Sequence, residues 1–155
     1  MFNQLLNVFK PNRYKNMHTK ENYYSNNISK AIEYQKNGML DNALEIYNEL
    51  YVNLENDNCQ KELALVLNNM IVIKKELNMN AEELFNKLLK LRFSLLIKYE
   101  EYYAIDYIYT LLMGVEWFGL PKDTLTKAEN MLKIYSGFSI YQPTLEKINK
   151  LRAVA

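Results

Sequence analysis

The sequence has few of the residues from which catalytic and metal sites are built. Its 155 residues include one histidine, His18, and one cysteine, Cys59. A transition-metal site usually combines three or four such ligands, and an internal disulfide needs two cysteines. The glycine-rich phosphate-binding motifs and the nucleophile elbow of serine hydrolases are also missing. We therefore predict a protein that is not an enzyme, with no catalytic residue, no metal site and no cofactor.

Net charge and long apolar runs are missing as well. The chain has 19 basic and 18 acidic residues, a formal net charge of +1. Such a balance creates no field that would attract nucleic acid, so no nucleic-acid partner is expected. Polar residues interrupt every apolar run before the roughly 18 residues that a membrane-spanning helix needs, and the first residues do not resemble a secretory signal. We expect no transmembrane segment and a cytoplasmic location, which a single cysteine also fits.

Glycine and proline are scarce, with four and three residues respectively. Few breaks in a helix-compatible sequence favour long helices joined by short turns. The chain is also long enough to bury a core, since 49% of its residues are hydrophobic. These features predict an all-α fold.

The N-terminal residues differ from the rest. Four apolar residues recur at helical spacing before Pro11, namely Phe2, Leu5, Leu6 and Phe9. They are followed by a basic stretch without acids, which completes a set of four cations, Lys10, Arg13, Lys15 and Lys20. We predict an amphipathic segment and basic linker over 1–20, and a single helical-repeat domain over 21–155. The apolar residues are interpreted as docking on that domain; a membrane-surface anchor and a partner-binding arm are the alternatives.

From Asn22 onward, apolar residues keep the spacing of helices. Glycine or asparagine at Gly38, Asn78 and Gly119 indicates turns that lie 40 and 41 residues apart. A period near 40 is typical of stacked two-helix units. We therefore predict a short α-solenoid of about three hairpins, closed by a C-terminal capping helix after Pro143. The predicted helices span 22–36, 40–54, 60–77, 100–118, 121–135 and 144–152, and one more begins at Asn80, whose end the sequence does not mark because residues 97–109 contain no glycine or proline.

The first hairpin has a particular series of residues. Ala31 and Ala43 allow close approach of two helices, Gly38 tolerates the positive φ of a tight turn, and the remaining positions are filled by large side chains, Tyr34, Leu40 and Tyr47. Over residues 24–55 this series resembles a tetratricopeptide repeat. The later units depart from the pattern, because asparagine stands at 78 and Glu83 and Thr124 replace the second alanine.

The resemblance implies that the first helix of each unit lines a concave binding surface. On the predicted helix 100–118, aromatic and acidic residues share one face, namely Tyr102, Asp106, Tyr109, Met113, Glu116 and Trp117. Aromatic anchors beside acids suit a peptide that carries Arg or Lys. The alternative is that Tyr109, Met113 and Trp117 belong to the core. The chaperone-binding carboxylate clamp of the family is not expected, since Ile28 and Ile32 stand at its positions.

These observations predict a non-catalytic scaffold or adaptor that binds a protein or peptide, with a basic partner favoured. One alternative is a small stoichiometric inhibitor or immunity-type protein that masks a partner enzyme. Another is an assembly subunit tethered through its N-terminal segment. No feature of the sequence indicates an oligomeric state.

Overall fold

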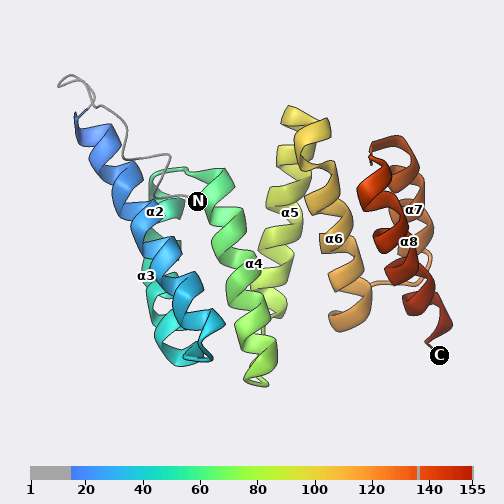
Figure 1. The fold of residues 1–155 in the computed structure, drawn as a ribbon, viewed down its shortest axis with the longest axis horizontal. Coiled ribbons are helices and arrows are strands. Elements are labelled where there is room, and N and C mark those ends of the chain that lie inside the picture. Colours follow the sequence, from blue (N-terminus) through green and yellow to red (C-terminus); the bar gives the residue numbers. More distant parts are fainter. Residues whose placement is uncertain (1–14, 136, 155) are drawn as a thin grey trace. The chain divides into compact units, whose positions relative to one another are not determined.

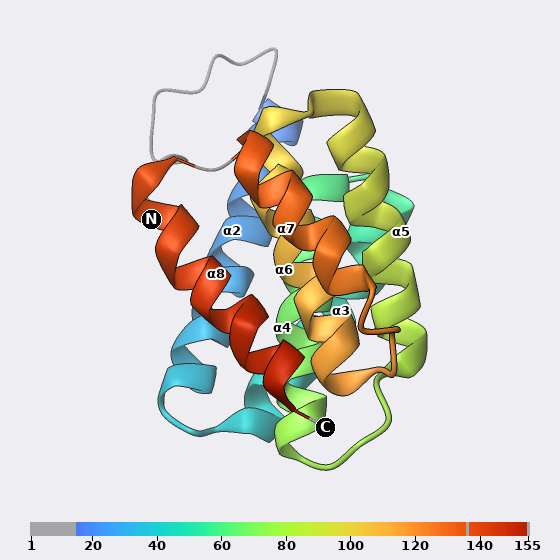
Figure 2. The ribbon, with the colours of Figure 1, turned by 90° about the vertical axis from the view of Figure 1, so that its right-hand side faces the viewer.

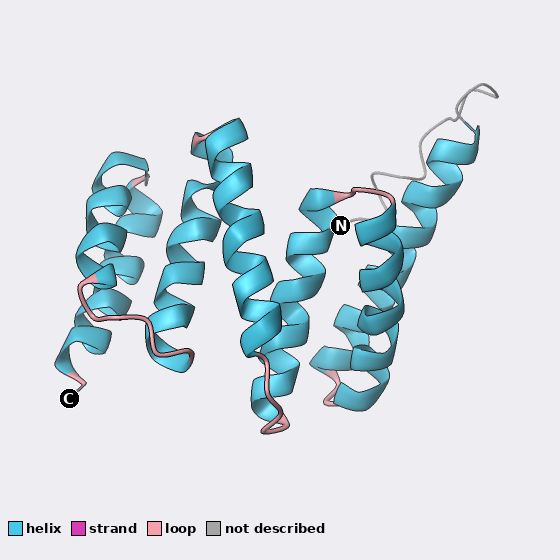
Figure 3. Ribbon diagram, turned by 180° about the vertical axis from the view of Figure 1, so that it is seen from behind, coloured by secondary structure: helices cyan, strands magenta, loops and turns pink. Residues whose placement is uncertain are grey.

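A computed structural model describes residues 15–135 and 137–154 of the chain (Figure 1). Within those ranges there are seven α-helices and no strand, and short loops join the helices (Figure 3). The predicted all-α class is therefore confirmed. The predicted docking residues Phe2, Leu5, Leu6 and Phe9 lie outside the described residues.

The chain divides into two compact units, one ending at Ala81 and one beginning at Glu82. The prediction of one domain over 21–155 stays a prediction. The first unit contains α2 (Lys15–Lys36), α3 (Leu40–Asn56) and α4 (Gln60–Glu76). The second contains α5 (Glu82–Tyr99), α6 (Glu101–Trp117), α7 (Thr124–Tyr135) and α8 (Phe138–Ala153).

Within each unit, consecutive helices pack against one another. In the first unit α2 packs on α3 and α3 on α4, and α2 also contacts α4. In the second, α5 packs on α6, α6 on α7 and α7 on α8, and α8 also contacts α6 (Figure 2). Contact between one helix and the next but one is what stacked hairpins produce, and the arrangement is compatible with a helical repeat fold.

Three turns close the helices in the same way. At Gly38 the φ angle is +75°, and at Asn58 and Asn78 it is +55°. After Gly38, the amide of Met39 donates to the carbonyl of Tyr34 at 2.9 Å. Asn58 and Asn78 are followed by the same pattern of bonds. These are Schellman caps, which need a residue that tolerates positive φ, and they lie at regular intervals of twenty residues.

Three helices begin three or more residues away from the predicted start, and the smallest difference is in α7, which begins at Thr124 where Pro121 was expected. The helix expected from Asn22 begins at Lys15, because polar residues between these positions do not oppose helix formation. The helix expected after Pro143 begins at Phe138 and continues through that proline. Pro143 has no N–H to donate to the carbonyl of Ser139, so α8 proceeds with one backbone hydrogen bond fewer. The C-terminal helix is therefore longer than predicted.

The second unit has a continuous apolar core supplied by α6, α7 and α8. Its fully or nearly buried members are Tyr107, Ile108, Leu111, Leu112, Leu125, Ala128, Leu132 and Ile148. They fix one face of α6 against its neighbours, which leaves the opposite face of that helix available to solvent.

Candidate functional site

The face of α6 that was predicted to bind a partner lies toward solvent. Tyr102 is 86% exposed, Tyr109 39% and Trp117 36%. Asp106 and Glu116 are exposed and Met113 is half-buried. The core of α6 is formed instead by residues such as Tyr107, Ile108 and Leu111. Aromatic side chains and acids thus stand together on one accessible surface, which we call the α6 face.

Helix α8 runs beside the α6 face. The hydroxyl of Tyr109 lies 3.0 Å from that of buried Thr144, and Lys147 Nζ lies 3.4 Å from Glu116 Oε2. These contacts occur in the same order along both helices, so α6 and α8 run in the same direction, as Figure 2 shows. The C-terminal ends of the two helices therefore lie at the same end of the site.

A cleft of about 360 Å³ lies between α6 and α8, and we call it the α6–α8 cleft. Its walls are formed by Glu116 from α6 and by one stripe of α8, namely Pro143, Glu146, Lys147, Lys150 and Leu151. Two acids and two lysines thus line the cleft together with two apolar side chains. Such a lining can contact both the charged head and the apolar stem of a long side chain.

A buried polar contact fixes the middle of α6. Arg92 of α5 donates to Thr110 Oγ1 at 2.8 Å, and Thr110 in turn donates to the carbonyl of Asp106, also at 2.8 Å. Burial lowers the pKa of Arg92, and the nearby carboxylate of Asp106 acts in the opposite direction. Arg92 of α5 thus contacts α6 one turn C-terminal to Asp106. This contact holds Asp106 at a defined position on the α6 face.

The predicted packing residues of the first hairpin lie in the first unit. Ala31, Ala43 and Tyr47 are fully buried, while Tyr34 and Leu40 are half-buried. The hydroxyl of Tyr47 donates to Gln35 Oε1 at 3.2 Å and accepts from Asn69 Nδ2 at 3.0 Å, which joins all three helices of the unit. Burial raises the pKa of Tyr47. These residues form a structural centre.

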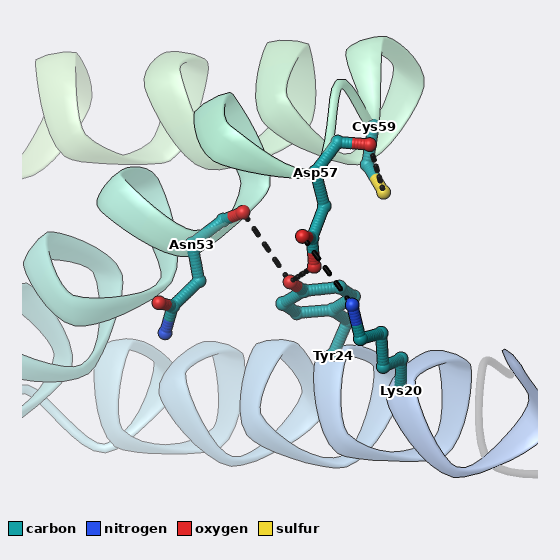
Figure 4. A network of polar contacts seen from close by, with 5 residues as sticks. All are labelled: Lys20, Tyr24, Asn53, Asp57 and Cys59. Carbon is teal, nitrogen blue, oxygen red and sulfur yellow. Dashed lines mark hydrogen bonds and ion pairs between the residues drawn. The ribbon is translucent and has the colours of Figure 1, made fainter. Parts of the chain in front are cut away.

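A second polar network lies at the turn between α3 and α4 (Figure 4). The hydroxyl of Tyr24 donates to the carboxylate of Asp57 and to the carbonyl of Asn53, and Lys20 Nζ lies 3.5 Å from Asp57 Oδ1. The hydrogen bond from Tyr24, assisted by the charge of Lys20, lowers the pKa of Asp57. Burial and nearby acids, Glu62 and Asp57, raise the pKa of Cys59. A raised pKa keeps this thiol protonated, which makes it a poor nucleophile.

Sequence reasoning missed the contribution of α8. Thr144, Lys147 and Lys150 were assigned only to a capping helix, although the stripe from Pro143 to Leu151 has the spacing of one helix face. The spacing was a usable signal. However, the spacing does not show that this stripe lies beside α6, because the neighbour of a helix face is set by tertiary packing.

Comparisons with protein-family models, with curated proteins and with solved structures give no match for this chain. None of the helices in the described ranges is long and apolar enough to cross a membrane. In the same ranges, no three side chains of His, Cys, Asp or Glu are grouped so that they could hold a metal ion.

Proposed function

We propose that this protein is a non-catalytic, tetratricopeptide-like scaffold that binds a basic peptide segment along the α6 face. The observation that carries the proposal is the exposure of Tyr102, Tyr109 and Trp117 on the same surface as two carboxylates. Large aromatic side chains at the surface supply most of the energy of many interfaces. Their π-faces also attract cations, so aromatic and acidic residues favour the same partner.

The spacing of the acids suggests the form of that partner. Asp106 and Glu116 stand ten residues apart on one helix, a separation of about 15 Å at 1.5 Å per residue. An extended peptide advances about 3.3 Å per residue, so cations four or five residues apart match this distance. An i, i+4 pair on an extended peptide also points to one side, as a flat face requires. We therefore expect an extended segment with two such cations.

Synthetic peptides with two arginines test this function. The series is built on Gly-Arg-Gly-Leu-Ser-Arg-Gly, in which the arginines are four apart, and varies the separation from two to eight residues. Fluorescence anisotropy measures the dissociation constant for each peptide. We expect the tightest binding at a separation of four, which matches the distance and places both arginines on one side of the peptide. We also expect Asp106→Lys/Glu116→Lys to lose that binding, because both contacts become repulsive.

The matched control reverses two exposed acids outside the α6 face. Glu45→Lys/Glu55→Lys on α3 changes the net charge by the same amount. It should retain the preference for a separation of four, with circular dichroism confirming that both variants stay helical. Equal loss of binding in the two variants would assign the effect to net charge and contradict the proposed site. Failure of every peptide to bind would contradict the proposed function.

A further inference from the structure

We propose that Lys147 occupies, in the free protein, the position that a cation of the partner takes in the complex. The inference rests on the proposed function and adds a mechanism to it. Binding at Glu116 then exchanges an internal ion pair for an intermolecular one, and Lys147 acts as a built-in competitor of the ligand.

The contact between Glu116 and Lys147 is suited to exchange. The two charged groups are 3.4 Å apart, and their side chains are 37% and 44% exposed. An ion pair at this level of exposure is weak and opens without disturbing the core. The lysine side chain has four rotatable carbons, so its ammonium group can move into solvent while α8 stays in place.

Glu116 is also placed where a cation is favoured. It lies in the last turn of α6, which contains no basic residue. The carbonyl groups at a helix C-terminus carry partial negative charge and add to the attraction of the carboxylate. Trp117 follows directly and is 36% exposed, so its ring offers a further contact for a cation. Lys147 of the neighbouring helix supplies the charge that α6 itself lacks.

The α6–α8 cleft indicates that this subsite takes one isolated cation. Pro143 and Leu151 provide apolar walls for the stem of an arginine or lysine. Lys150 also lines the cleft, and it has no ion pair with the part of the chain that the structure describes. Its positive charge balances the negative charge of Glu146, the other acid in the lining, so Glu116 is left as the carboxylate for one partner cation. A partner arginine with uncharged neighbours therefore fits best.

Removing the side chain of Lys147 tests the inference, because we expect the loss of this residue from the site to raise the affinity for the peptide. The probe is the fluorescein-labelled peptide Gly-Arg-Gly-Leu-Ser-Arg-Gly, measured by anisotropy on the whole protein. Lys147→Ala should bind it about two- to fivefold tighter than the unchanged protein, the range expected for loss of an exposed ion pair. Glu116→Gln should bind more weakly. The double variant Lys147→Ala/Glu116→Gln should bind no tighter than Glu116→Gln alone, because Lys147 then has no carboxylate to release.

Arg152→Ala provides the matched control. It removes another cation from α8 and frees another acid, since Arg152 Nη2 lies 2.8 Å from Glu129 Oε2. Neither residue lines the α6–α8 cleft. A gain of affinity in Lys147→Ala but not in Arg152→Ala supports exchange at Glu116. A gain of the same size in both would overturn the inference, because it would reflect net charge alone.

The remaining outcomes separate the two proposals. If Lys147→Ala and the unchanged protein bind equally and Asp106→Lys/Glu116→Lys does not bind, Lys147 is no competitor but the proposed function stands. Weaker binding by Lys147→Ala would overturn the inference by assigning the cleft to an anionic group. If no protein in the set binds the peptide, both proposals fail.

Discussion

Gly114 lies near the C-terminal end of α6, where the neighbouring segments leave no room for a side chain. A Cβ atom at this position would lie 2.7 Å from Phe85 Cζ and would also collide with the side chain of Leu120. Phe85 is almost fully buried and stacks on Phe118, with ring centroids 4.4 Å apart. Because that stack fills its space, Phe85 has no easy direction in which to move.

We predict that Gly114→Ala destabilises the protein. Overpacking a core costs about 1–3 kcal/mol. That exceeds the roughly 0.5–1 kcal/mol that alanine gains over glycine inside a helix. Urea denaturation followed by circular dichroism measures the difference. Gly137→Ala is the control: nothing lies within 4 Å of its Cβ position and its φ is −76°, so it should cost only the preference of an N-cap position for glycine over alanine, which is less than the cost of Gly114→Ala. An equal loss in both variants would contradict the steric explanation.

At the scale of single residues, helical spacing indicates which side chains are buried but not which partners they contact. Helical spacing correctly placed Ala31, Ala43 and Tyr47 among buried residues. It did not reveal the role of Gly114, because the need for a glycine there comes from Phe85 and Leu120 on other segments. Nor could it show the pairing of Glu116 with Lys147, since ion pairs between helices depend on packing that periodicity does not encode.

The residues that join consecutive helices differ in type and in backbone conformation. Most junctions in the described residues use glycine or asparagine at positive φ, but α5 and α6 meet at Glu100. Its φ is +42° and its ψ is −104°, a combination that glycine adopts readily and other residues adopt at a cost. The sequence contains no breaker at this point, which is why the end of α5 was difficult to predict.

We predict that Glu100→Gly stabilises the protein by about 1 kcal/mol, because it relieves the strained backbone at the junction. The adjacent Glu101 provides the control, since it is the first residue of α6 and has a helical environment. Glu101→Gly should lower the stability by about 0.5–1 kcal/mol. Thermal unfolding of both variants reports the opposite signs. Destabilisation by Glu100→Gly would show that this junction is not strained in solution.

Most helices were predictable at the scale of elements, and the reasons for the exceptions are physical. Turns at Gly38, Asn78 and Gly119 all have positive φ, as the residue types indicated. The predicted start of α8 was wrong because proline disfavours a helix without forbidding it. Packing of α8 against α6 and α7 compensates for the one backbone hydrogen bond that Pro143 cannot make. Tertiary contacts overrode the local preference.

At the scale of the whole molecule, periodicity reports which residues are buried without reporting what covers them. This is why a repeat near 40 residues indicated stacked hairpins but gave no sign of a division at Ala81. The core formed by α6, α7 and α8 lies entirely within the second unit. A unit with its own core has the means to fold by itself.

We therefore predict that a fragment of residues 82–155 folds on its own. Its circular dichroism should be helical, and its unfolding in urea should be a single cooperative transition, because α5 to α8 carry their packing partners with them. The variant Leu112→Ala, which opens a cavity in that core, should lower the midpoint of the transition. A gradual transition that Leu112→Ala does not affect would show that the second unit depends on the first.

Because Lys147 pairs with Glu116 in the free protein, a ligand binds at Glu116 only when its cation interacts with that carboxylate more strongly than Lys147 does. The exchange contributes to the binding free energy only the difference between the two ion pairs. A cation that interacts with the carboxylate no more strongly than lysine does therefore adds little affinity. Arginine can bind a carboxylate through two parallel hydrogen bonds, whereas lysine offers a single point charge. The exchange would therefore discriminate between the two residues in favour of arginine. The exchange would also leave the number of ion pairs at Glu116 unchanged. Added salt should therefore weaken binding less than at a site where the ligand forms a new ion pair without replacing an existing one.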